Sequence, residues 1–158
     1  MNKKKKTPFV SLIQKIEKTV NDRGMSVTEK LWRICGILKE SVPHYDWVGF
    51  YLVDRAKKNE LVLGPYVGDP TVHTRIPFGR GICGQAAATK KMFLVQDVSK
   101  ETNYLACSAK VKSEVVLPIF KGKEIVGELD IDSHTESAFE ESDTRFLQQV
   151  CDIVSQLF

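Results

Sequence analysis

The chain has 158 residues, of which 42% are hydrophobic and 27% are charged, and its formal net charge is +3 at pH 7. These values are typical of one soluble globular domain with one core, and no stretch approaches the ~20 apolar residues that span a bilayer. Lys3, Lys4, Lys5 and Lys6 start the chain without an apolar run beside them, so we expect no signal peptide and a cytoplasmic protein. We interpret 1–7 as a disordered basic segment before a single domain over 8–158. An electrostatic arm is the alternative, but the near-neutral body favours neither nucleic acid nor membrane as a partner.

The hydrophobic pattern predicts helices at both ends of the chain and strands between them. Ser26 and Glu29 form a capping box before the second helix. The expected helices cover 8–21, 27–40, 84–90 and 141–157, and the expected strands cover 46–53, 60–66, 72–77, 93–95, 113–120 and 124–132. This order predicts an α+β fold in which the terminal helices cover one face of a mostly antiparallel sheet. The segment 64–112 then covers the other face, and a ligand pocket is expected beneath it.

Alternation of side chains divides the closing hairpin into two faces. We expect a three-residue loop over 121–123, which places Glu114 opposite Asp130. One face then gathers the aliphatic side chains Val115, Leu117, Ile119, Ile125, Leu129 and Ile131, and the other gathers the acids Glu114, Glu128, Asp130 and Asp132. Such an acidic face is either simply solvated or, beneath a covering segment, suited to a cationic ligand group and to acid–base chemistry.

The first strand adds aromatic side chains to the same face. Trp47, Gly49 and Tyr51 alternate with the more aliphatic Val48, Phe50 and Leu52, which we assign to the core. Trp47 and Tyr51 could then enclose a thioether, sulfoxide or methyl group, although Trp47 could also be an ordinary core residue.

The four cysteines divide into two kinds. Cys35 and Cys151 lie on apolar helical stripes and are interpreted as packing residues. Cys83 lies at an expected helix N-terminus, where the helix dipole favours a thiolate, unless its neighbouring glycines merely shape a turn. Cys107 lies in a polar loop close to Lys110 and is interpreted as reactive. Because no Cys-x-x-Cys pair is present, we expect no structural zinc site.

Several segments together resemble one known family. They are Asp-Trp-Val-Gly-Phe-Tyr from Asp46, Leu-Val-Leu-Gly-Pro-Tyr from Leu61, Arg-Ile-Pro-Phe-Gly-Arg-Gly-Ile-Cys-Gly from Arg75, Leu-Ala-Cys from Leu105, Ser-Glu-Val-Val-Leu-Pro-Ile from Ser113 and Leu-Asp-Ile-Asp-Ser from Leu129. In this order the segments are similar to the free methionine-R-sulfoxide reductases, which have a GAF domain. His73 stands where the family often has a further cysteine.

The resemblance implies a redox enzyme that reduces the R-epimer of free methionine sulfoxide. It implies that Cys107 is the nucleophile and Cys83 an accessory cysteine that could form a disulfide with it. It further implies active-site carboxylates at Glu114, Asp130 and Asp132, which would also bind the substrate, and a pocket wall at Trp47 and Tyr51. An external thioredoxin-like reductant, no bound cofactor, no metal and a possible homodimer through the terminal helices complete the expectation. The alternative is a non-catalytic GAF sensor of a small metabolite or amino acid.

Overall fold

The computed structural model describes residues 8–106 and 108–158, so the expected basic segment 1–7 and Cys107 lie outside the described residues. Its elements follow the order expected from the sequence, and most bounds agree within two residues. They are α1 (Phe9–Val20), α2 (Val27–Ser41), β1 (Trp47–Val53), β2 (Glu60–Val67), β3 (Arg75–Pro77), α3 (Gly81–Thr89), β4 (Phe93–Val95), the 3-10 turn Val98–Lys100, β5 (Ser113–Lys121), β6 (Glu124–Ser133), α4 (Glu141–Val154) and the 3-10 turn Ser155–Leu157.

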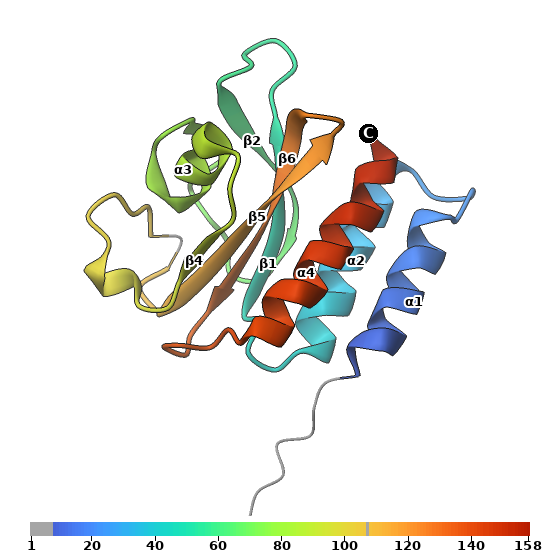
Figure 1. The fold of residues 1–158 in the computed structure, drawn as a ribbon, viewed down its shortest axis with the longest axis horizontal. Coiled ribbons are helices and arrows are strands. Elements are labelled where there is room, and N and C mark those ends of the chain that lie inside the picture. Colours follow the sequence, from blue (N-terminus) through green and yellow to red (C-terminus); the bar gives the residue numbers. More distant parts are fainter. Residues whose placement is uncertain (1–7, 107) are drawn as a thin grey trace, which may run out of the picture.

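The strands form a six-stranded sheet in the order β3-β2-β1-β6-β5-β4, and every neighbouring pair is antiparallel. Figure 1 shows α1, α2 and α4 together on one side of this sheet, whereas α3 and the segments around it lie on the other. The expected α+β architecture is therefore confirmed. Within the described part of the chain, we find no helix long and apolar enough to cross a membrane.

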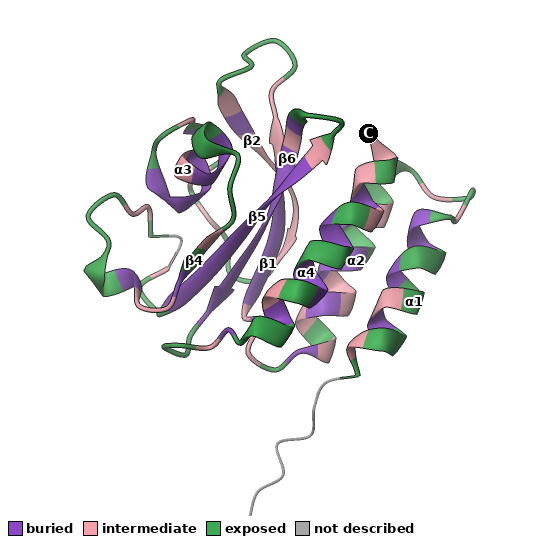
Figure 2. Ribbon diagram, viewed as in Figure 1, coloured by how far each residue is buried: buried purple, intermediate pink, exposed green. Residues whose placement is uncertain are grey.

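The larger core lies between the sheet and the three helices α1, α2 and α4. It contains Phe50 of β1, Leu117 of β5 and Leu129 of β6, all 0–1% exposed, together with Cys35 and Cys151. Burial raises the pKa of both thiols, which supports their interpretation as packing residues. In Figure 2 the buried stripes of the helices face this core and their exposed stripes face outward.

Capping boxes begin two of these helices. The Ser26 side chain accepts from the Glu29 N–H at 3.2 Å and the Glu29 carboxylate accepts from the Ser26 N–H at 2.7 Å, as the sequence predicts. At α4, the buried Asp143 carboxylate accepts from the Glu140 N–H at 2.8 Å and from the Tyr45 hydroxyl at 2.7 Å, and His44 lies 2.9 Å away. Asp143 thus joins the start of α4 to the segment that leads into β1.

The expected pairing of β5 with β6 is wrong by two residues. The turn contains only Gly122 and Lys123, because Lys121 pairs with Glu124, and Gly122 has a φ of 62°. Such a two-residue turn takes glycine at its first position. A bulge at Val126 then adds one residue to β6, so Glu114 lies opposite Asp132 and not opposite Asp130. The bulge also turns Ile125 to the other face of the sheet, where it joins a second, smaller core with Ile82 and Ala86 of α3, and not with Leu129 as expected.

Candidate active site

Three rungs of the sheet form the floor of the site, and the central strand β6 supplies an acid to each. Asp132 lies between Trp47 of β1 and Glu114 of β5, and Asp130 lies between Gly49 and Val116. Glu128 lies in the third rung, between Tyr51 and Pro118. The sheet therefore brings together five of the seven residues singled out from the sequence, on the face opposite the larger core, and Cys83 joins them from α3 as the sixth.

The acids of β6 are buried and poorly paired. Glu128, Asp130 and Asp132 are 0–1% exposed, and both carboxylate oxygens of Glu128 and of Asp132, as well as Oδ1 of Asp130, have no hydrogen-bond partner. Burial raises the pKa of Asp130 to about 6. Burial and the neighbouring Asp130 raise the pKa of both Glu128 and Asp132, and the side chain of Glu114 partly opposes this rise at Asp132. The floor therefore holds protons near neutral pH or accepts a cation.

Aromatic rings stand beside this acidic floor. The Trp47 indole packs over Gly49, where an added Cβ would lie 2.3 Å from Trp47 Cη2. It stacks on Tyr66 at a centroid distance of 5.2 Å and donates from Nε1 to the Asp69 carbonyl at 3.1 Å. The Tyr51 hydroxyl donates to the carbonyl of His73 at 2.9 Å. Both rings thereby also hold the segment 68–74 over the sheet.

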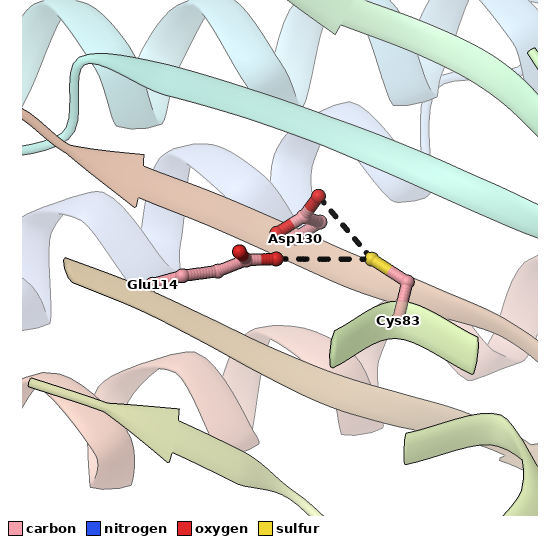
Figure 3. Close-up of side chains that lie close together, drawn as sticks. All are labelled: Cys83, Glu114 and Asp130. Carbon is pink, nitrogen blue, oxygen red and sulfur yellow. Dashed lines mark hydrogen bonds between the residues drawn. The ribbon is translucent and has the colours of Figure 1, made fainter. Parts of the chain in front are cut away.

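Cys83 lies in the first turn of α3, and its side chain points from this helix toward the acidic floor. Its thiol lies 3.3 Å from Asp130 Oδ2 and 3.9 Å from Glu114 Oε1 (Figure 3). Burial raises the pKa of this thiol well above its ordinary value, and the charges of Asp130, Glu128 and Glu114 raise it further. The prediction that Cys83 is a thiolate at this helix N-terminus is therefore wrong for the protein without a ligand, because desolvation and the nearby acids outweigh the helix dipole.

Asn103 fastens the loop before Cys107 to the start of α3. Its Oδ1 accepts from the Gly81 N–H at 2.8 Å and its Nδ2 donates to the Gly79 carbonyl at 2.8 Å. Gly81 has a φ of 65°, and an added Cβ would lie 2.9 Å from Leu105 Cγ. These contacts explain why α3 begins at Gly81 and not at residue 84. The sequence carries no local signal for this role of Asn103, because its partners are more than 20 positions away.

Cys107 itself lies outside the described residues, but its neighbours border the site. The carbonyl of Ala106 lies 3.0 Å from His73 Nε2. Leu105 lines a hollow with Cys83 and Asp130, and Ser108 lines a second hollow with Trp47 and Asp132. Each hollow has a cavity volume of about 10 Å³, which holds no more than a water molecule. Entry of a larger ligand therefore requires the covering segments to move.

The antiparallel six-stranded sheet, with helices on one face and covering segments on the other, is that of a GAF domain, and a family model described as "GAF domain" matches residues 24–158. GAF domain-containing protein A of Dictyostelium discoideum is 40% identical over 92% of this chain and 89% of its own. Free methionine-R-sulfoxide reductase of Escherichia coli is 39% identical over 77% of this chain and 69% of its own. The crystal structure of free methionine-R-sulfoxide reductase from Neisseria meningitidis in complex with its substrate has a TM-score of 0.87 and 38% identity, covering 95% of this chain and 87% of that one.

These matches identify not only the fold of the chain but also its family. The chain belongs to the free methionine-R-sulfoxide reductases, a family of oxidoreductases within the GAF domains. The resemblance noted in the sequence is confirmed.

Proposed function

We propose that this protein reduces free L-methionine-R-sulfoxide to methionine, with a cysteine thiol as the electron donor. The observation that carries the proposal is the set of buried carboxylate oxygens without partners on Asp130 and Asp132, directly beside Trp47. A free amino acid offers what this floor lacks, namely an ammonium group, and its sulfur side chain suits an aromatic wall. The relatives that carry this activity in their names support the same substrate.

In the proposed complex, Asp132 and Glu114 bind the substrate ammonium, and Trp47 and Tyr51 contact its side chain. Asp132 and Trp47 both line one hollow, and Asp130 and Tyr51 both line the other. A ligand spanning the two hollows thus meets an acid and an aromatic ring at each end. Movement of the segments 68–74, 101–106 and 108–112 admits it.

The proposed chemistry is transfer of the sulfoxide oxygen to Cys107. The Cys107 thiolate attacks the sulfoxide sulfur while an acid protonates the oxygen, which yields methionine and leaves Cys107 as a sulfenic acid. Asp130 is the candidate acid, because burial raises its pKa to about 6 and keeps a proton available near neutral pH. The contact between His73 and Ala106 would hold the segment that precedes the nucleophile.

Cys83 is the proposed resolving cysteine. Its thiol proton can pass to Asp130 across 3.3 Å, and the resulting thiolate attacks the Cys107 sulfenic acid, forming a disulfide and releasing water. A thioredoxin-like dithiol then reduces the disulfide, so the reaction needs no bound cofactor. This cycle requires the reducing environment of the cytoplasm. We further propose a homodimer through the terminal helices, which sedimentation of the purified chain tests.

Incubation with racemic free methionine sulfoxide and dithiothreitol, followed by chiral chromatography, tests the proposal. We expect loss of the R-epimer alone, with one methionine formed per sulfoxide consumed. Cys107→Ser should abolish this turnover, and the matched variant Cys151→Ser should retain it. Binding of the sulfoxide without any methionine would reject the enzyme and favour a sensor. Turnover by Cys107→Ser would reject the assigned nucleophile.

A further inference from the structure

Three potential metal ligands from separate elements meet beneath the covering loop. They are the sulfur of Cys83 on α3 and one carboxylate oxygen each from Glu114 on β5 and Asp130 on β6. Figure 3 shows both carboxylates pointing toward the sulfur, and the three atoms all lie within 4.8 Å of one another. All three residues are at least 95% buried. The expectation of no structural zinc site rested on the absence of Cys-x-x-Cys spacing, which does not test ligands that are distant in sequence.

The buried carboxylates of this region favour the binding of a cation. Oδ1 of Asp130 and both oxygens of the adjacent Asp132 are buried without a hydrogen-bond partner. Among the ion pairs of residues 8–106 and 108–158, none joins a lysine or an arginine to Asp130 or Asp132. Buried carboxylates without partners need a proton or a cation. This observation is independent of the spacing of the three ligand atoms.

The spacing of the ligands fits a small tetrahedral ion. Bonds of about 2.3 Å to sulfur and about 2.0 Å to oxygen place neighbouring tetrahedral donors about 3.5 Å apart for a sulfur–oxygen pair. The observed separations are 3.3 Å from Cys83 Sγ to Asp130 and 3.9 Å to Glu114. Both sulfur–oxygen separations thus lie within a few tenths of an ångström of the tetrahedral value. A thiolate with two carboxylates favours Zn²⁺ over Mg²⁺ or Ca²⁺, which prefer oxygen ligands alone.

We propose that Cys83, Glu114 and Asp130 bind a Zn²⁺ ion, with water in the fourth position, and that the bound ion inhibits the enzyme. On binding, the Cys83 thiol loses its proton to solvent and its sulfur coordinates the ion, with no change in oxidation state. The ion occupies Glu114, which is assigned to the substrate ammonium, Asp130, which is assigned to proton transfer, and the Cys83 thiol, which is assigned to resolution. The binding site is argued from geometry and charge alone, whereas the inhibition rests on the proposed function.

Cobalt binding to the reduced full-length chain tests the site without measuring activity. We expect Co²⁺ to give the sulfur-to-metal charge-transfer band and the strong visible absorption of a tetrahedral site, both lost on addition of Zn²⁺. Cys83→Ser should remove the charge-transfer band and weaken cobalt binding about tenfold or more, whereas Cys151→Ser should change neither. An unchanged band in Cys83→Ser, or its loss only in Cys107→Ser, would overturn the proposal.

A second measurement on the unmodified chain covers the case in which Cys83→Ser does not fold. The thiols of Cys83 and Cys35 are both buried, so an alkylating reagent reaches them only when the protein opens transiently. Mass spectrometry should show that Zn²⁺ slows the alkylation of Cys83 and leaves the alkylation rate of Cys35 unchanged. Equal rates at Cys83 with and without Zn²⁺ would reject the site. Metal binding without inhibition of sulfoxide reduction would reject only the inhibitory role, and turnover without metal binding would reject the site while the proposed function stands.

Discussion

Gly49 allows the Trp47 ring to lie over the sheet, so Gly49→Ala should displace one wall of the site. The added Cβ would lie 2.3 Å from Trp47 Cη2 and 2.8 Å from Tyr66 Cβ. An ordinary contact begins at 3.4 Å, so the ring has to move by 3.4 − 2.3 = 1.1 Å. This shift would strain the 3.1 Å hydrogen bond from Trp47 to the Asp69 carbonyl. Overpacking costs about 1–3 kcal/mol and the hydrogen bond about 1 kcal/mol, for a destabilisation of roughly 2–4 kcal/mol.

The matched control is Gly36→Ala, because an added Cβ at Gly36 in α2 meets nothing within 4 Å. This control should stabilise the protein by about 0.5–1 kcal/mol. Urea unfolding gives both values, and a Trp32→Phe background isolates the fluorescence of Trp47, which is 3% exposed. We expect a red-shifted emission and an increase of about tenfold or more in the KM for methionine sulfoxide in Gly49→Ala alone. If Gly49→Ala matched Gly36→Ala in stability, emission and KM, Trp47 would not form this wall.

Three further predictions concern residues around the site. Glu128→Gln removes a carboxyl whose pKa is raised in the folded state by burial and by Asp130. The free energy of unfolding of the wild type, relative to that of the variant, should therefore fall as the pH rises above about 4.3. The slope should be about 1.4 kcal/mol per pH unit up to the folded pKa. The same pH dependence of the urea-derived free energy of unfolding in the wild type and in Glu128→Gln between pH 5 and pH 8 would contradict this. Burial raises the pKa of Asp143, but hydrogen bonds with His44, the Glu140 N–H and Tyr45 outweigh this effect and lower it. Asp143→Asn should therefore destabilise the protein by about 1–3 kcal/mol at pH 7 and by progressively less below about pH 4. Thermal melting measures both effects. Asn103→Ala removes two hydrogen bonds to the start of α3. It should speed amide exchange in 101–106 and lower kcat, while the free energy of global unfolding changes by no more than about 2 kcal/mol. Unchanged amide exchange would exclude Asn103 as a positioning residue.

Side-chain alternation predicted much of this site because it depends only on local backbone geometry. Alternation alone puts Trp47 and Tyr51 on one face of β1, and Asp130 and Asp132 on one face of β6. The two faces coincide because both strands turn their aliphatic side chains toward the same core. The pairing of β5 with β6 was mispredicted because a two-residue turn and a bulge at Val126 together preserve the same alternation. Hydrophobic pattern alone does not distinguish that combination from a three-residue loop.

Features that depend on contacts between distant segments could not be read from the sequence. The pKa of the Cys83 thiol follows from burial against Asp130 and Glu114, residues more than 30 positions away. The contact of His73 with Ala106 and the hydrogen bonds of Asn103 likewise join separate loops. Local motifs located the helix that carries Cys83, but not what its sulfur faces.

Comparison of free and N-acetylated methionine-R-sulfoxide as substrates tests the central claim most directly. The two share the sulfoxide, but only the free amino acid carries the ammonium group that Asp132 and Glu114 are proposed to bind. We predict that the free form has a kcat/KM at least about 100-fold higher, corresponding to a loss of about 2.7 kcal/mol, and that Asp132→Asn narrows this ratio. Equal kcat/KM for the two substrates would contradict an acidic floor that recognises a free amino acid.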